Sequence, residues 1–284
     1  MTLPLRSDAP LTPAFIGHAA TLALHDELAL TPKPGLVTLI DRGAHSDMDA
    51  HTFMRSLFAL RRYFVQIAEA GQAGAGFPEL ERLGIAAEAR MLDATRGINT
   101  HRGAIFMLGL LCAAAGAVAR DRAHAMTPSV LREAMQVRWG DALAQRSQRA
   151  PILPGGIATR RLGLRGASEE AAMGFPVLFR TAVPTLARGL ARGLSPRLAR
   201  LDTLFHVMAV LDDSNLAHRG GLEGLRHAQG VAQGYIDRGG SAAPGGLAAA
   251  ETIANDFVVR RLSPGGAADT LAAACWVMRI CGAS

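Results

Sequence analysis

Residues 103–119 read GAIFMLGLLCAAAGAVA, the longest stretch of the chain without a charged side chain. Most of these side chains are small, and the stretch is at the lower limit of length for crossing a bilayer. We therefore interpret it as a central buried helix rather than as a membrane span. A helix that is apolar on every face has to be enclosed by other elements of the same protein.

The rest of the chain predicts helices around this one. Thr12-Pro13 and Ser195-Pro196 are typical helix starts, and apolar residues three and four positions apart follow most such signals. Strand signals are nearly absent, and neither a linker nor a repeat of fixed period is evident. We predict an all-α fold, a single multi-helix domain over residues 1–284 with a polar site built from inter-helix loops.

Composition narrows the class of ligand. The formal net charge is +6, and nearly all of the 30 basic residues are arginine, whose planar fork matches phosphate oxygens. Because aromatic residues make up only 5% and acidic residues are interleaved with the basic ones, a nucleic-acid surface is disfavoured and a nucleotide is favoured. Three cysteines without a CxxC motif and an N-terminus without an apolar signal region predict a cytoplasmic protein.

The segment 31–49, TPKPGLVTLIDRGAHSDMD, is a long connection without helical periodicity, which is usually functional or disordered. Its apolar residues argue against disorder. Asp41, Asp47 and Asp49 are spaced to converge, and carboxylate oxygens in a turn suit Mg²⁺. The alternative is structural: Asp49 caps the next helix, and Asp41 and Asp47 lie in turns.

A second polar segment, GINTHRG at 97–103, leads directly into the apolar helix. Asn99, His101 and Arg102 would lie beside free backbone N–H groups at the helix N-terminus, which favours an anion. The alternative is a polar cap with a solvent-facing histidine.

The third polar segment is LDDSNLAHRGG at 211–221. Asp212 and Asp213 follow an apolar helix, where carboxylates face the negative end of the helix dipole, so a cation is expected to compensate them. His218 and Arg219 supply polar neighbours, and the alternative is a simple helix stop and restart. Because this charge is uncompensated when no metal is bound, Asp213→Ala is expected to abolish catalysis and to raise or preserve stability.

Other polar residues have structural and functional interpretations side by side. Arg165 belongs to a basic loop, residues 151–166, which is either a solvated surface or a phosphate contact. Glu27 lies one turn before the first polar segment and is placed to face its ligand, whereas Asp26 is interpreted as structural. The sequence does not indicate whether the Asp269 side chain faces the site or the solvent.

These segments resemble a known family, the ATP-dependent triphosphoribosyl-dephospho-CoA synthases that make the prosthetic-group precursor of citrate lyase and malonate decarboxylase. The resemblance covers most of the chain. Its matching blocks are TPKPGLV (31–37), DRGAHSDMD (41–49), GINTHRGAIFMLGLL (97–111), GFP (174–176), LDDSNLAHRGG (211–221) and LSPGGAADTLAA (262–273).

The resemblance implies a reaction. The 2′-hydroxyl of 3′-dephospho-CoA attacks the ribose C1 of ATP, adenine leaves, and the product passes to the transferase that loads a carrier protein. Inversion at C1 implies direct displacement without a covalent enzyme nucleophile. The catalytic residues expected on this basis are Asp47, Asp49, Asp212 and Asp213. The expected Mg²⁺ ligands are Asp41, Asp47, Asp212 and Asp213. The expected substrate-binding residues are Lys33, Asn99, His101, Arg102, Arg165, His218 and Arg219.

The sequence also departs from the family pattern. Ser214 stands where relatives often have threonine, and Ser168 replaces an arginine in the run before GFP, so Glu170 matches the family glutamate and Arg165 is the candidate substitute. The variant run favours the malonate decarboxylase branch. Two alternatives stay open: a metal-dependent N-glycosyl hydrolase resembling ADP-ribosylglycohydrolases, and a helical binding module without catalysis.

Overall fold

The computed structural model describes residues 11–121 and 125–282, which form twelve α-helices and no strand. The predicted all-α fold is confirmed. The helices are α1 (Pro13–Leu28), α2 (Ala50–Ala73), α3 (Phe77–Thr95), α4 (Arg102–Asp121), α5 (Pro128–Ser147), α6 (Pro154–Arg161), α7 (Ala167–Ala172), α8 (Val183–Ala191), α9 (Pro196–Val210), α10 (Ser214–Asp237), α11 (Gly246–Val259) and α12 (Gly265–Cys281).

Side-chain caps define several of the helix N-termini. Thr12, Asp49, Thr127 and Ser195 each accept a backbone N–H from the first turn of the helix that follows, which satisfies a donor without an intrahelical partner. These are the starts that the sequence signals predict.

The loop predicted at residues 151–166 is partly helical. The segment interpreted as a proline- and glycine-rich loop contains α6, because Pro154 can occupy the first turn of a helix without losing a hydrogen bond. Helix α11 begins at Gly246. A π-helical turn, Leu178–Ala182, leads directly into α8, which has Pro184 in its first turn.

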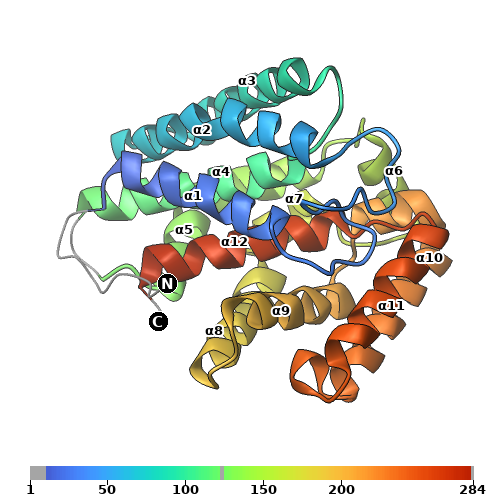
Figure 1. Ribbon diagram of the computed structural model, residues 1–284. Helices are drawn as coiled ribbons and strands as arrows, with labels where there is room; N and C mark the ends of the chain where they lie inside the picture. Colours follow the sequence, from blue (N-terminus) through green and yellow to red (C-terminus); the bar gives the residue numbers. More distant parts are fainter. Residues whose placement is uncertain (1–10, 122–124, 283–284) are drawn as a thin grey trace.

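The helices pack in layers around α4 and α12 (Figure 1). On one side α2 packs against α1, α3 and α4, and on the other side α12 packs against α1, α4 and α9. A single hydrophobic cluster draws on helices from α1 to α12, which supports one domain for the part of the chain that the structure describes.

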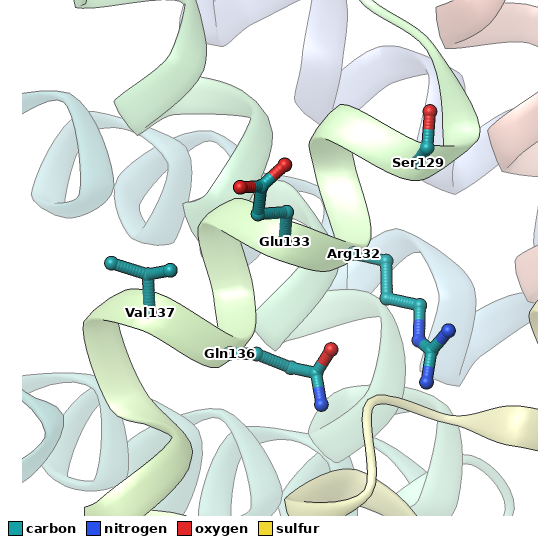
Figure 2. Close-up of a pocket in the computed structure, with 5 residues that line it drawn as sticks. All are labelled: Ser129, Arg132, Glu133, Gln136 and Val137. Atoms are coloured by element: carbon teal, nitrogen blue, oxygen red, sulfur yellow. The ribbon is translucent and has the colours of Figure 1, made fainter.

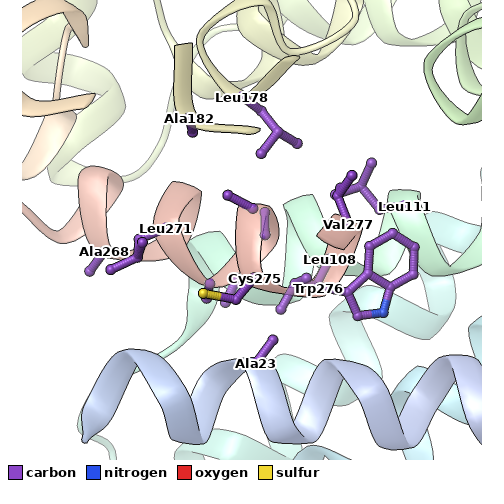
Figure 3. Packing of buried hydrophobic residues seen from close by; sticks show 14 of the residues in the cluster. Ala23, Leu108, Leu111, Leu178, Ala182, Ala268, Leu271, Cys275, Trp276 and Val277 are labelled. Atoms are coloured by element: carbon purple, nitrogen blue, oxygen red, sulfur yellow. The ribbon is translucent and has the colours of Figure 1, made fainter. Parts of the chain in front are cut away.

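Helix α12 is buried along most of its length. Figure 3 shows Cys275 and Trp276 on this helix, with Ala23 of α1 and Leu178 of the π-helical turn on opposite sides of it. The Trp276 indole N–H donates to the Ile16 carbonyl at 3.1 Å, so its one polar atom is satisfied inside the core.

Helix α4 contains the apolar stretch 103–119 and is mostly buried, which confirms the prediction of a central helix. By length and composition alone it would be able to cross a membrane, but here it is enclosed by the other helices. It approaches α2 at backbone distance: a Cβ on Gly71 would lie 2.0 Å from the Ala113 carbonyl oxygen, and one on Gly116 would lie 2.1 Å from that of Ala68. Only glycine permits this contact.

Candidate functional site

The segment between α1 and α2, residues 29–49, is an ordered part of the interior over its first half. Residues 32–38 are buried, and Val37 and Met48 pack against Leu28 in a small apolar cluster. The guanidinium of Arg197 on α9 donates to the Thr31 carbonyl at 2.7 Å. This packing agrees with the interpretation that the segment is not a solvated linker.

Beneath this segment lies a group of polar side chains that we call the buried polar cluster. Its members come from four separate parts of the chain: Glu27, Lys33, His101, Asp213 and Asp269. Lys33 has a fully buried ammonium group that donates to the Glu27 carbonyl at 2.7 Å and to its carboxylate at 2.5 Å. Burial lowers the pKa of Lys33, and the Glu27 carboxylate opposes that shift.

His101 is held at one ring nitrogen and left without a partner at the other. Its Nδ1 lies 2.6 Å from the Ser56 hydroxyl, to which Thr100 donates at 2.7 Å, and Phe53 packs edge-on with ring centroids 4.9 Å apart. Burial, with the nearby charge of Lys33, lowers the pKa of His101 to about 3, so the ring is neutral at pH 7. Among the described residues, the buried Nε2 has no hydrogen-bond partner.

Asp213 joins the N-termini of two helices. One carboxylate oxygen accepts the backbone N–H groups of Asn215 at 2.9 Å and Leu216 at 3.3 Å in α10, and the other accepts that of Ala267 in α12 at 2.9 Å. Burial raises the pKa of Asp213, and these donors act against that shift. The expectation of uncompensated charge at a helix C-terminus is therefore wrong, because positive helix ends already surround this carboxylate.

Asp269 lies against the start of α4. A Cβ on Gly103 would lie 2.0 Å from an Asp269 carboxylate oxygen, so the close approach depends on glycine. Burial, and then the charges of Glu27 and Asp213, raise the pKa of Asp269 well above its usual value, while the Ala104 backbone N–H lowers it. This carboxyl group holds a proton more firmly than an ordinary aspartate does.

A second group of residues lies at the more exposed edge of the segment, and we call it the outer rim: Asp41, Arg42, His45, Asp47, Asp49 and Arg219. Asp49 caps α2 through the Thr52 backbone N–H and hydroxyl, both at 2.9 Å. Asp41 accepts the Gly43 N–H at 2.6 Å within a turn. The structural alternatives therefore describe these two aspartates, while the Asp47 side chain stays 58% exposed.

His45 and Arg219 tie the outer rim to the start of α12. The His45 Nδ1 accepts from the Arg219 guanidinium at 3.0 Å, and its Nε2 lies 2.9 Å from the Ser263 hydroxyl. Arg219 also donates to the Ala44 and Arg261 carbonyls at 3.3 and 3.4 Å. Burial, and then the Arg219 charge, lower the pKa of His45 to about 4, although Asp47 opposes the shift.

Asp212 lies in a separate small pocket beside Arg165 and Glu170. The Arg165 backbone N–H donates to the Asp212 carboxylate at 3.1 Å, and its guanidinium approaches Glu170 at 3.4 Å. Glu170 also accepts the Val177 N–H at 3.2 Å, and burial raises its pKa. Three residues singled out from the sequence are therefore brought together here.

Three predicted substrate-binding residues lie apart from these groups. The Arg102 guanidinium pairs with Glu88 of α3 at 2.6 Å. Asn99 is exposed, and its side-chain oxygen accepts the Arg102 backbone N–H at 3.1 Å, so it contributes to the start of α4. His218 is exposed on α10.

The predicted metal ligands do not form one cluster. Asp41 and Asp47 belong to the outer rim, Asp212 lies in its own pocket, and Asp213 is a buried cap. Within residues 11–121 and 125–282, no three His, Cys, Asp or Glu side chains are arranged to hold one metal ion.

A shallow pocket elsewhere contains none of these residues. Figure 2 shows that it is lined by Ser129, Arg132, Glu133, Gln136 and Val137, all from α5. Arg132 there donates to the carbonyls of Met173 and Gly174, each at 3.1 Å, which is a packing role. The functional site does not lie here, because the residues of the three polar segments gather at the buried polar cluster, the outer rim and the Asp212 pocket.

Sequence reasoning passed over several polar residues of the site. The sequence motifs indicate neither Ser56 nor His45 as a site residue, leave the orientation of Asp269 open, and indicate Glu27 only by its position. Three of these residues are identifiable from the sequence, because His45 and Asp269 lie inside the matching blocks and Ser56 follows one. Histidine at 45 among aspartates was the strongest available signal.

Comparison with known proteins gives a consistent result. Residues 13–283 match the model of a family described as ATP:dephospho-CoA triphosphoribosyl transferase. Proteins from two strains of Vibrio cholerae serotype O1 are each 38% identical over 270 residues, which cover 92% of this chain and 86% of theirs. Both carry the name "Probable 2-(5''-triphosphoribosyl)-3'-dephosphocoenzyme-A synthase". No solved structure matches the chain.

Proposed function

The chain belongs to the ATP:dephospho-CoA triphosphoribosyl transferase family, and from this premise we propose that it transfers the triphosphoribosyl group of ATP to the 2′-hydroxyl of 3′-dephospho-CoA. The hydroxyl oxygen bonds to the ribose C1, the bond from C1 to the adenine nitrogen breaks, and the hydroxyl proton is balanced by protonation of adenine. The observation that carries the proposal is that segments matching the family meet in one region, at the buried polar cluster and the outer rim.

We propose that the buried polar cluster receives the ribose. It combines three carboxyl groups with one lysine, which Glu27 already pairs, and with a neutral histidine. Such surroundings disfavour a triphosphate and stabilise the positive charge that develops on a sugar as its glycosidic bond breaks. On this assignment Lys33 positions Glu27, a change from the phosphate contact that the family resemblance implies.

Asp269 is our candidate for the acid that protonates the departing adenine. Its carboxyl group is held at the start of α4, beside Gly103, and its raised pKa favours the protonated form. A carboxylic acid that keeps its proton near neutral pH is suited to donate it to a leaving group. Our candidate for the group that accepts the hydroxyl proton is Glu27, whose charge acts on Asp269 and whose carboxylate caps no helix.

The triphosphate is proposed to lie along the arginines of the more exposed edge. Arg42 and Arg219 belong to the outer rim, and Arg165 lies beside Asp212. Arginine forks bind phosphate oxygens in pairs of hydrogen bonds. Of the predicted substrate-binding residues, Arg219 and Arg165 are the two that we retain for this role.

Magnesium fits the outer rim as an ion carried by the triphosphate. Mg²⁺ keeps several waters and is usually bound by one or two carboxylates together with substrate phosphates, so a dedicated cluster of protein ligands is not required. Asp47 is the carboxylate that would hold it, because its side chain is exposed and not used as a cap. When bound, the ion neutralises phosphate charge.

The product would pass to a transferase that loads a carrier protein. We propose the malonate decarboxylase branch on the basis of the Ser168-Glu169-Glu170 variant described above. We also propose a cytoplasmic location, since the three cysteines of the chain are buried thiols without disulfides.

The experiment that tests the function follows adenine release and the mass of the CoA species in a mixture of protein, ATP, Mg²⁺ and 3′-dephospho-CoA. We expect adenine only when 3′-dephospho-CoA is present, together with a triphosphoribosyl adduct. Adenine without an adduct would favour the hydrolase, and the absence of both products would contradict the proposal. The Asp269→Asn variant is expected to lose turnover and to keep its fold.

A further inference from the structure

A chain of hydrogen bonds runs from Thr100 through Ser56 to His101. Thr100 donates to the Ser56 hydroxyl oxygen at 2.7 Å, and that hydroxyl lies 2.6 Å from the His101 Nδ1. Ser56 belongs to α2, whereas Thr100 and His101 directly precede α4. Two helices are therefore needed to hold this ring.

The order of the bonds favours one tautomer of His101. The Ser56 oxygen accepts from Thr100, which leaves the proton of Ser56 for donation to Nδ1. A neutral imidazole that accepts at Nδ1 carries its proton on Nε2. His101 is only 3% exposed, and its Nε2 has no partner among the described residues, so a buried N–H donor is left for a ligand.

The surroundings indicate which part of a nucleotide this donor meets. The neighbouring cation, Lys33, is paired with Glu27, and Asp213 and Asp269 add carboxyl groups to the same cluster. A neutral donor among carboxyl groups suits an uncharged acceptor, such as a ring nitrogen of a base or a ribose oxygen, better than a phosphate.

We propose that Thr100 and Ser56 are positioning residues that hold His101 as a neutral Nε2–H donor to the base or ribose of the bound nucleotide. The proposal rests on the proposed function for the identity of that nucleotide. The tautomer itself is independent of it, and Phe53 supports the geometry by packing edge-on against the ring.

The tautomer is tested by ¹⁵N NMR of the histidine side chains in the full chain, with the His101 signals assigned by comparison with His101→Gln. The wild-type protein is expected to show the Nε2–H form without titration between pH 5.5 and 8, since the pKa of His101 is lowered to about 3. Thr100→Val is expected to give a mixture of tautomers, and Thr100→Ser is expected to restore the single form. An Nδ1–H tautomer in the wild-type protein would overturn the proposal.

Ligand titrations in the same spectra identify the acceptor. ATP is expected to shift the His101 Nε2 signal, and inorganic tripolyphosphate at the same concentration is expected to leave it unchanged. A tripolyphosphate shift equal to that of ATP would assign the donor to phosphate and overturn the proposal, as would the absence of a shift with ATP.

Turnover provides the second readout. Thr100→Val is expected to lower kcat for adenine release by at least about tenfold with little change in the KM for 3′-dephospho-CoA, because the tautomer is disturbed and the acceptor's contacts are not. Thr203→Val is the matched control: it removes another buried hydroxyl, which donates only to the Ala199 carbonyl of α9 at 2.7 Å, and it should keep wild-type kcat. Equal kcat in both variants would contradict the proposal. Wild-type protein that shows the Nε2–H tautomer and releases no adenine would instead refute the proposed function alone.

Discussion

The buried polar cluster and the outer rim contain the same kinds of residue but use them differently. In the cluster, each carboxyl group is engaged by another part of the protein, as Glu27 is by Lys33 and Asp213 is by the N-termini of α10 and α12. At the rim, Asp47 stays largely exposed, and the ring of His45, which is neutral at pH 7, lies 3.8 Å from its carboxylate. Substitutions in the cluster are therefore expected to lower stability together with activity, whereas substitution of Asp47 at the rim is expected to affect activity alone.

The comparison teaches that a polar motif can serve the fold and the site at once. Asp212 and Asp213 are adjacent in sequence, yet one lines a small pocket with Arg165 and the other is a buried cap. Substitution of Asp213 should consequently lower stability, whereas substitution of Asp212 should mainly affect the pocket that it lines.

Asp213→Ala is expected to have the largest effect on stability. Removing the carboxylate leaves backbone N–H groups of two helices without an acceptor, and we expect the free energy of unfolding to fall by about 3 kcal/mol. Urea denaturation measures this. Asp213→Asn keeps one acceptor oxygen, so its denaturation midpoint should lie between those of the wild type and Asp213→Ala. An unchanged midpoint for Asp213→Ala would show that the caps do not contribute to stability.

Gly103→Ala tests the contact between α4 and Asp269. The added Cβ would lie 2.0 Å from the Asp269 carboxylate oxygen, so the carboxyl group must move. We expect a loss of about 2 kcal/mol of stability from overpacking, together with loss of turnover. Gly140→Ala in α5 is the control, because nothing lies within 4 Å of its Cβ and the substitution should be neutral or stabilising. Full activity of Gly103→Ala would remove Asp269 from the site.

The pH dependence of stability tests the link between the outer rim and α12. The pKa of His45 in the folded protein, about 4, is below its ordinary value of 6.5, so the unfolded chain binds the proton more readily. Its contribution to stability is therefore complete above pH 6.5 and is lost as the pH falls toward 4. At pH 5 the loss should be about 2 kcal/mol.

The comparison of wild type with His45→Gln isolates this contribution from those of other groups. The difference in thermal midpoint between the two proteins should shrink as the pH is lowered from 7.5 to 5. A difference that is constant with pH would mean that His45 is not held neutral.

Asp47→Asn is expected to have the smallest effect on stability. The side chain is exposed and caps no helix, so the change in unfolding free energy should be below about 0.5 kcal/mol. Turnover should nevertheless require a higher Mg²⁺ concentration, which a titration of adenine release against Mg²⁺ measures. If Asp47→Asn instead destabilises the protein and leaves the Mg²⁺ titration unchanged, the rim is structural as well.

Much of the fold was predictable because its signals are local. Thr12 and Ser195 are typical N-cap residues followed by proline, and each indicates a helix start. The apolar stretch 103–119 indicates a buried helix by composition alone. Helix α6 was missed because proline and glycine suggest a loop, although Pro154 is placed where a helix tolerates it.

The site was less predictable because its contacts are distant in sequence. The segments that meet were identified, but the direction of each side chain depends on helix packing. Asp213 was interpreted from the helix that precedes it, whereas its partners belong to α10 and α12. Likewise the role of His101 depends on Ser56, which lies on another helix, and no local pattern connects the two.

The close contact of α2 and α4 at Gly71 and Gly116 determines which parts of the site are able to move. Two helices that touch at the backbone cannot slide or separate without breaking that contact, so they behave as one rigid body. Ser56 on α2 and His101 at the start of α4 therefore keep their 2.6 Å contact while substrates enter and leave. Hydrogen exchange is therefore expected to be slow in α2 and α4, and it should be faster in the exposed residues 39–42 than in the buried residues 32–38.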